Sequence, residues 1–228
     1  MKTDNKTRQS QINHYKKLFD KYKGTPMAVS SESEAHKSLR FTKISQIFLN
    51  ENKIQVHDVG MGLGDYYEYL KKTFPNKIIE YSGSEIVEEY FSETKTKFPE
   101  SEFYLRDIAE KPGEEKYDYV ILSGVFHQRR DSTIGEWENF AQNIIRNSFK
   151  MCNKGIAFNF ISPFVDFYQT EVYYCNLPKL INFINDDLSR FFTLNHNYPL
   201  FEFTMFVYKE EYIKSLYKEK EFQKYFKI

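Results

Sequence analysis

Cysteine is scarce in this chain, and its scarcity excludes two kinds of small protein. The 228 residues include 2 cysteines, Cys152 and Cys175, which stand far apart. Such a pair can form neither the disulfide framework of a small secreted domain nor a zinc cluster with closely spaced ligands. We therefore expect both cysteines to be buried free thiols.

Excess charge and long apolar runs are also missing. The 32 Lys and Arg residues balance 32 Asp and Glu residues, so no overall field attracts a polyanion, and a nucleic-acid partner is disfavoured. No stretch reaches the ~18 consecutive apolar residues of a membrane helix. Residues 1–17 lack the apolar core of a secretory signal. The sequence therefore predicts a cytoplasmic protein that does not bind membranes.

Repeats and linkers are absent, whereas hydrophobic residues are plentiful. They make up 41% of the chain, enough for one large core. Residues 1–228 are therefore predicted to form a single domain.

Apolar spacing predicts strands that alternate with helices. Helices are expected over residues 5–23, 33–49, 65–74, 86–98, 132–152 (capped by Asp131 or Ser132) and 178–189, and a helical tail over 210–228. Strands are expected over 54–59, 156–161, 191–196 and 201–208. Such alternation implies a parallel sheet with helices on both faces, and ligands at the carboxyl ends of the strands.

The most informative segment is Asp58-Val-Gly-Met-Gly-Leu-Gly64, where a strand enters a glycine-rich turn. Gly60, Gly62 and Gly64 remove the side chains that would keep a ligand from the backbone, and they leave free N–H groups at a helix start. In a dinucleotide fingerprint the third glycine comes five residues after the first, but here it comes four after. Asp58 also suits an ammonium better than a pyrophosphate. The loop is therefore predicted to bind a cationic nucleoside.

This loop resembles the first motif of class I S-adenosylmethionine (SAM)-dependent methyltransferases. Three further segments resemble later motifs of that family in the same order: Tyr81–Ile86, Phe103–Ile108 and Tyr117–Phe126. The resemblance implies that Glu85, with Ile86 beside it, binds both ribose hydroxyls. It further implies that Asp107 and Ile108 flank the adenine, and that Ser123 and Gly124 line the methionine part.

The resemblance also implies an architecture. It predicts a three-layer α/β sandwich with a seven-stranded, mostly parallel sheet whose last strand is antiparallel. Residues 1–50 are expected to form a helical cap, 54–208 the Rossmann-like core and 210–228 a C-terminal helix. Segments Tyr22–Val29 and Arg40-Phe41 resemble the cap of a bacterial branch, in which the Arg reaches the methionine carboxylate. The alternative for Arg40 is a solvated side chain on a polar helix face.

Two histidines are candidates for a catalytic base. His127 directly follows the fourth strand motif, and a neutral imidazole can accept a proton near neutral pH. The alternative is a histidine that hydrogen-bonds the cofactor or a neighbouring loop. His196, between the two closing strands, is a weaker candidate that can instead stabilise the hairpin together with Glu202.

Polar side chains after the fifth strand are candidates for the acceptor pocket. They are Asp166, Tyr168, Tyr173 and Tyr174, and structural packing is the alternative for each tyrosine. The fourth strand ends in Ser123-Gly-Val-Phe126 rather than the Asn/Asp-Pro-Pro-Tyr/Phe of enzymes that methylate base or glutamine amino groups. A small polar acceptor is therefore favoured, with no catalytic metal.

The leading hypothesis is a SAM-dependent methyltransferase whose acceptor is a hydroxyl of an activated sugar or of another surface-glycan precursor. The glycan part depends on resemblance of the cap and of Phe158–Pro163 to bacterial enzymes of that kind. A non-catalytic SAM-binding protein and an NAD(P)-dependent oxidoreductase are the alternatives. The aromatic terminal helices can be covered by their own domain or by a second copy, so a homodimer is one expected arrangement.

Overall fold

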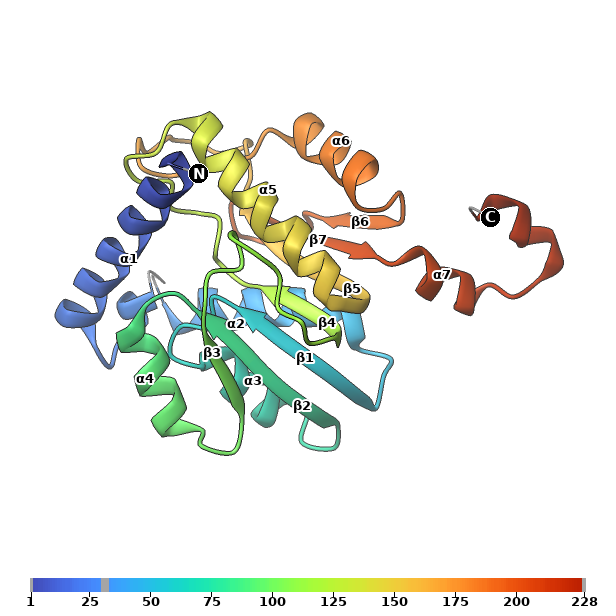
Figure 1. Cartoon of the computed structure of the whole chain (residues 1–228), viewed down its shortest axis with the longest axis horizontal. Helices are drawn as coiled ribbons and strands as arrows, with labels where there is room; N and C mark the ends of the chain where they lie inside the picture. The colour runs from blue at the N-terminus through green and yellow to red at the C-terminus, as the bar shows by residue number, and fades with distance from the viewer. Residues whose placement is uncertain (1, 30–32, 227–228) are drawn as a thin grey trace.

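The computed structural model describes residues 2–29 and 33–226 and contains one seven-stranded sheet. The strands lie in the order β3-β2-β1-β4-β5-β7-β6 (Figure 1). They are β1 (Lys53–Val59), β2 (Ile78–Glu85), β3 (Glu102–Leu105), β4 (Tyr117–Leu122), β5 (Cys152–Ile161), β6 (Phe192–Asn195) and β7 (Glu202–Tyr208).

Helices follow β1, β2 and β4, as the apolar spacing predicted, whereas a loop joins β3 to β4. The α-helices are α1 (Lys2–Tyr22), α2 (Glu34–Ile44), α3 (Asp65–Thr73), α4 (Glu88–Lys97), α5 (Ile134–Met151), α6 (Leu177–Asp187) and α7 (Glu210–Leu216). Short 3-10 helices are η1 (Pro26–Val29), η2 (Ser45–Phe48) and η3 (Lys220–Tyr225). The helix expected over 33–49 is therefore divided into α2 and η2.

Strand β7 alone runs against the others. It pairs antiparallel with both β5 and β6, so β6 points the same way as the first five strands. The expected seven-stranded sheet with an antiparallel closing strand is confirmed. The pairing of Ile161 with Glu202 places the start of β7 at the carboxyl end of β5, the edge where ligands bind in such sheets.

Each face of the sheet packs against its own set of helices. One apolar cluster joins β4, β5 and β7 to α5 and α6, with Trp137 fully buried at its centre. The other cluster joins β1 and β2 to α2, η2 and α3, and contains Phe48 and Tyr66. These two clusters form a three-layer sandwich (Figure 1). Cys152 and Cys175 are buried free thiols, as expected.

The start of α5 corrects one prediction from the sequence. Its N-cap is Thr133 rather than Asp131 or Ser132, because Thr133 forms a reciprocal capping box with Glu136. The Thr133 hydroxyl accepts from the Glu136 N–H at 3.3 Å, and the Glu136 carboxylate accepts from the Thr133 N–H at 2.9 Å. Two satisfied N–H groups favour this start over an earlier one.

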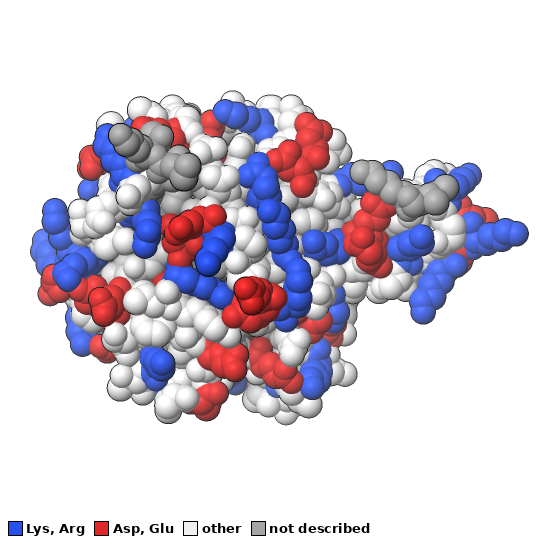
Figure 2. All heavy atoms as spheres, in the orientation of Figure 1, with Lys and Arg blue, Asp and Glu red and all other residues white. Residues whose placement is uncertain are grey.

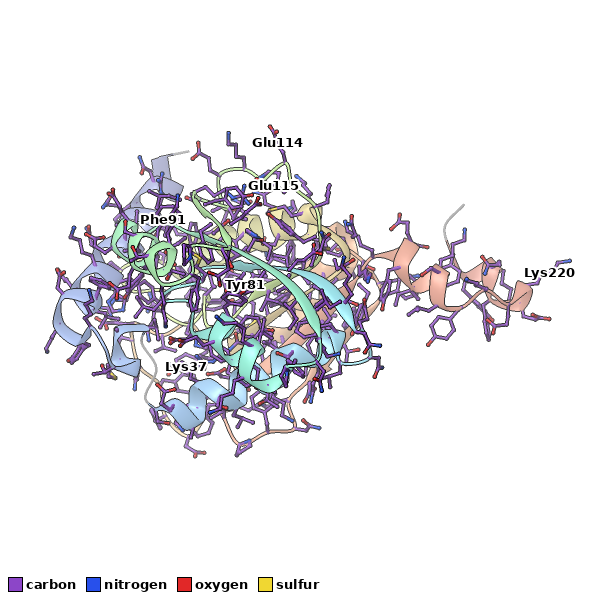
Figure 3. The ribbon with its side chains drawn as sticks, turned by 90° about the horizontal axis from the view of Figure 1, so that it is seen from below. Lys37, Tyr81, Phe91, Glu114, Glu115 and Lys220 are labelled. Atoms are coloured by element: carbon purple, nitrogen blue, oxygen red, sulfur yellow. The ribbon has the colours of Figure 1, made fainter. Side chains whose placement is uncertain are left out.

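The C-terminal tail also differs from the single helix expected over 210–228. Helix α7 ends at Leu216, and η3 follows after a turn. Neither element contains a buried residue, and together they project from the body as an arm (Figures 1 and 2). Figure 3 shows Lys220 of η3 near the tip of this arm. Tyr212 of α7 contacts the body, with its hydroxyl 3.3 Å from that of Tyr119, and Phe226 folds back, with its ring centre 5.7 Å from that of Phe191.

Candidate functional site

The glycine-rich turn has a backbone that other residues would strain. Gly60, Gly62 and Gly64 have φ angles of 74°, 55° and 74°, in the left-handed region. A Cβ on Gly60 would lie 2.9 Å from a methyl of Val125, and one on Gly64 would lie 2.6 Å from the ring of Phe98. The turn is therefore built for glycine by both conformation and space.

A cavity opens above this turn at the carboxyl ends of β1, β2 and β4. It contains about 1120 Å³ of space between atoms, part of which is open to solvent. Ten of the eleven predicted cofactor residues line it: Arg40, Asp58, Gly60, Gly62, Glu85, Ile86, Asp107, Ile108, Ser123 and Gly124. Gly64 is outside the wall and packs beneath the turn against Phe98. The structure thus brings together residues from the four separate sequence motifs.

Glu85 ends β2 and fixes the shape of the turn. Its carboxylate accepts hydrogen bonds from the backbone N–H groups of Gly62 at 3.0 Å, Ile86 at 2.7 Å and Val87 at 2.9 Å. Burial raises the pKa of Glu85, and the three N–H donors counteract part of that rise. The carboxylate is therefore a fixed acceptor that lines the cavity and retains lone-pair capacity for further donors.

Asp58 at the end of β1 is an acid with an altered proton affinity. Its carboxylate accepts a hydrogen bond of 2.7 Å from the hydroxyl of Tyr81, and both side chains are buried. Burial raises the pKa of Asp58 to about 7, although the Tyr81 hydroxyl acts in the opposite direction. A cation bound beside Asp58 would favour its charged form.

The opposite end of the cavity combines one acid with an apolar wall. Asp107 accepts a hydrogen bond of 2.8 Å from the Ala109 N–H and forms an ion pair with Arg8 at 3.4 Å. Ile108 lies nearby, and α5 contributes Trp137, Phe140 and Ile144. This arrangement fits a flat heterocycle with an amino group, because the ring meets apolar side chains and a carboxylate can accept from the amine.

Several wall residues were not identified from the sequence. They are Gln11 and Tyr15 of α1, Lys37 of α2, and the α5 side chains Trp137, Phe140 and Ile144. Tyr15 and the α5 side chains belong to apolar helix faces, but a core-facing stripe and a cavity-facing stripe have the same period, and the polar Gln11 and Lys37 carry no local signal. Only tertiary structure distinguishes the two.

Arg40 faces the cavity but is not a free cation. Its guanidinium donates to Glu202 through Nε at 3.0 Å and through Nη2 at 2.6 Å. Lys37, one turn earlier in α2, is paired with Asp65 at 2.6 Å. Both cations are therefore held in place before any ligand arrives.

His127 is buried outside the cavity wall. Its Nε2 lies 3.0 Å from the amide nitrogen of Asn159, and its Nδ1 lies 3.9 Å from a carboxylate oxygen of Glu202. An amide nitrogen can only donate, so Nε2 is the acceptor and the ring proton sits on Nδ1. Burial lowers the pKa of His127 to about 4, so the ring is neutral near pH 7.

The predicted acceptor residues lie apart from the cavity wall. Tyr173 is buried and donates to Glu138 at 2.9 Å, whereas Tyr168 donates to the Pro163 carbonyl at 3.0 Å. The hydroxyl of Tyr174 accepts from the Gln169 N–H, and Asp166 is exposed. Each of these tyrosine hydroxyls thus has a partner within the protein, and a role of these residues toward an acceptor stays a prediction.

His196 belongs to a group of exposed aromatic residues at the carboxyl edge of β5. Its ring centre lies 6.2 Å from that of Phe164, and Phe167 lies 6.1 Å from Phe201. Phe164, Phe167 and Tyr168 are 69%, 57% and 69% exposed. A cluster of exposed aromatic rings of this kind is typical of a binding surface.

The described parts of the chain contain neither a cluster of metal ligands nor a helix that could cross a membrane. Within residues 2–29 and 33–226, no group of three His, Cys, Asp or Glu side chains is arranged to hold a metal ion. Over the same residues, none of the helices is both long and apolar enough to span a bilayer.

No family model matches the chain, but individual proteins do. The Mycobacterium tuberculosis protein named "Putative methyltransferase Rv1506c" is 25% identical over 157 residues, covering 68% of this chain and 92% of that protein. The magnesium protoporphyrin IX methyltransferase of Synechocystis PCC 6803, solved with bound SAH, superposes with a TM-score of 0.60 at 14% identity, covering 91% and 99%.

A third similar protein has a different named activity. The [4+2]-cyclase SpnF has a TM-score of 0.51 and 12% identity, covering 72% of this chain and 61% of that one. Identities this low indicate a shared fold only. The chain thus has the fold of class I SAM-dependent methyltransferases, and its activity must be argued from its own site.

Proposed function

We propose that the protein is a SAM-dependent methyltransferase that acts in the cytoplasm on a small polar metabolite. The observation that carries this proposal is the cavity, in which a glycine turn, a buried acid at the end of β2 and an acid near an apolar wall occur in one continuous space. When bound, SAM would supply a methyl group on a sulfonium. The protein then needs chiefly to orient two reactants and to exclude water.

The residues of the cavity fit this cofactor in three places. The acceptor site of Glu85 that its three backbone N–H donors leave open can be shared by the ribose hydroxyls, and Asp107 offers an acceptor to the adenine amine. At the other end, Asp58 suits an ammonium and Arg40 suits a carboxylate. A pyrophosphate would instead meet the buried carboxyl of Asp58, which disfavours the oxidoreductase alternative.

The acceptor is proposed to be a hydroxyl of an activated sugar or of another surface-glycan precursor. The exposed rings of Phe164, Phe167, Tyr168 and Phe201 support a cyclic acceptor, because flat rings can pack against its C–H face. Acidic and basic side chains are interspersed over the face in Figure 2, which supports a small molecule over a polyanion. The non-catalytic alternative retains the cofactor contacts but needs no acceptor.

Ligand binding and methyl transfer test the proposal in turn. SAM or its demethylated product should raise the free energy of unfolding by ~2.7 kcal/mol at a hundred times its dissociation constant, and NADH should have no effect. Stabilisation by NADH alone would support an oxidoreductase. Labelled SAM incubated with a fractionated cell extract should then label a small molecule, whereas binding without transfer would support the non-catalytic alternative.

Replacement of His127 by alanine tests whether this residue is the base. Because Asn159 occupies Nε2 and the ring is outside the cavity wall, we expect kcat at saturating SAM to stay within ~3-fold of wild type. A base would contribute ~10²–10⁴-fold. A kcat lowered by ~100-fold or more, with unchanged SAM affinity, would instead identify His127 as the base. His196 stays a prediction that the same assay can test.

The homodimer is proposed to form through the C-terminal arm. Leu216, Tyr217, Phe222 and Tyr225 are 56%, 51%, 42% and 58% exposed although they are large and apolar. Because an aromatic side chain has ~150–250 Å² of surface, each arm exposes roughly 400 Å². Two arms that each cover an equal area of a second copy would bury roughly 1,600 Å², the size of a stable interface.

Solution mass measurements test the dimer. We expect wild-type protein to be dimeric at micromolar concentration and the double variant Tyr217→Glu/Phe222→Glu to be monomeric, because each charge would have to be buried without a partner. Phe164→Glu is the matched control, since Phe164 is 69% exposed but lies outside the arm. A wild-type monomer at ~100 µM would contradict the proposal.

A further inference from the structure

A buried polar network lies directly behind the cavity wall. It joins Arg40 of α2, Glu202 of β7, Asn159 of β5 and His127 from the segment after β4. Asn159 donates to Glu202 at 2.6 Å and to His127 Nε2 at 3.0 Å, and its carbonyl oxygen accepts from the Gly124 N–H at 2.8 Å. Every polar atom of the Asn159 side chain is therefore used, which fixes the orientation of its amide group.

The network holds a full negative charge on Glu202. Burial opposes this charge, but the neighbouring His127, the paired Arg40 guanidinium and the hydrogen bond from Asn159 together hold the pKa of Glu202 down, at about 2. The two parallel bonds from Nε and Nη2 form a bidentate pair, the strongest geometry for Arg and carboxylate. A single orientation of Arg40 is thus preferred before a ligand binds.

In that orientation, one nitrogen of the Arg40 guanidinium, Nη1, points toward the cavity. Among the described residues, no hydrogen-bond acceptor reaches Arg40 Nη1. A Cβ built on Gly124 would lie 3.3 Å from Nη1, so this nitrogen sits directly over Gly124. Arg40 and Gly124 line the cavity, whereas Glu202, Asn159 and His127 do not. The network therefore supports, from behind, two groups that face the ligand.

We propose that Glu202 and Asn159 are positioning residues that select a ligand with an α-carboxylate: Glu202 directs Arg40 Nη1, and Asn159 fixes the Gly124 backbone beside it. This inference extends the proposed function, because it assigns the carboxylate to the amino-acid end of SAM. The free Nη1 is a donor that is already ordered, so its bond to a carboxylate costs less side-chain entropy than a solvated Arg would require.

The neighbouring charges fit a zwitterionic ligand end. Glu202 balances the charge of Arg40, and Asp65 balances that of Lys37. The site thus has little net charge to attract a simple anion, but it presents a directed N–H donor and the nearby Asp58 carboxyl. A ligand end with both an ammonium and a carboxylate satisfies both groups together.

Two ligands that differ in one group can show whether Glu202 positions Arg40 or only supports the fold. SAM and decarboxylated SAM are such a pair, because they differ only in the carboxylate. We expect Glu202→Gln to weaken binding of SAM by ~10-fold or more while changing binding of decarboxylated SAM by less than ~2-fold. Thr204→Val is the control, because Thr204 is buried on the same strand and its hydroxyl lies 3.0 Å from that of Tyr198 rather than bonding Arg40. It should not discriminate between the two ligands.

Second variants keep the inference testable if Glu202→Gln does not fold. Arg40→Lys retains the charge but loses the fork, and Asn159→Ala removes the support of Gly124; both should show the same selective loss. A variant that loses affinity equally for SAM and decarboxylated SAM would contradict the proposal. Unchanged or tighter binding of SAM by Glu202→Gln would also contradict it, because Glu202 would then compete with SAM for Arg40.

The wild-type protein separates this inference from the proposed function. If it binds SAM and decarboxylated SAM equally well, only this inference fails. If it binds neither ligand, the proposed function is overturned.

Discussion

Replacement of Glu85 by alanine is expected to weaken SAM binding by ~100-fold or more. A hydrogen bond from a ribose hydroxyl to a buried carboxylate stabilises the complex by ~1.5–3 kcal/mol, so its loss accounts for most of this effect. The variant also leaves the N–H groups of Gly62, Ile86 and Val87 without their acceptor, which loosens the turn. Isothermal titration of wild type and variant measures the effect.

Control variants must show whether Glu85→Ala weakens binding through the lost ribose contact or through a disordered glycine-rich turn. Glu80→Ala removes an exposed acid of the same strand and should leave affinity unchanged. Circular dichroism should show that Glu85→Ala is folded. Glu85→Gln, which keeps the size of the side chain, should lose part of the affinity. An unchanged dissociation constant in both Glu85 variants would show that the ribose does not bind there.

Binding of SAM is expected to weaken roughly 20-fold between pH 7.5 and pH 5.5. The pKa of Asp58 is raised to about 7 by burial, and only the charged form attracts the cationic end of the ligand. Protons and cofactor therefore compete, and affinity falls toward tenfold per pH unit below pH 7. The amino group of SAM becomes more fully protonated over the same range, which would strengthen its binding to Asp58, so titration of the ligand does not cause the loss.

The sign of this effect is opposite for the protein without ligand. Because the folded pKa of Asp58 exceeds the unfolded value of 3.8, the folded state holds the extra proton, and this group lowers stability as pH rises from about 4 to 7. Asp58→Asn should remove both dependences. Burial raises the pKa of Glu85 as well, so a pH profile that persists in Asp58→Asn would assign the proton to Glu85 instead.

The architecture could be predicted from the sequence because its signals are local. Glycines at positions of positive φ, alternating apolar periods and a proline after the helix that ends at Thr73 each act over a few residues. The motif segments then meet at one edge because parallel strands end there. This explains why ten predicted cofactor residues share one cavity.

The polar network behind the cavity wall could not be predicted from the sequence, because its residues are far apart in the chain. Arg40 and Glu202 belong to a helix and a strand at opposite ends of the chain, and no local pattern pairs them. Glu202 was considered only as a hairpin residue beside His196, whereas the structure turns it inward toward Arg40. The cap of α5, by contrast, has a local signal that the sequence prediction overlooked, because Thr133 and Glu136 have the spacing of a capping box. Nothing local indicated that the tail would leave the body as an arm.

A crystal structure with S-adenosylhomocysteine tests the central claim most directly. We predict that the adenosine lies across the backbone of residues 60–64 with its ribose on Glu85 and its carboxylate on Arg40. Electron density for the nucleoside elsewhere in the molecule would contradict this account, as would a pyrophosphate group of another ligand bound in the glycine turn.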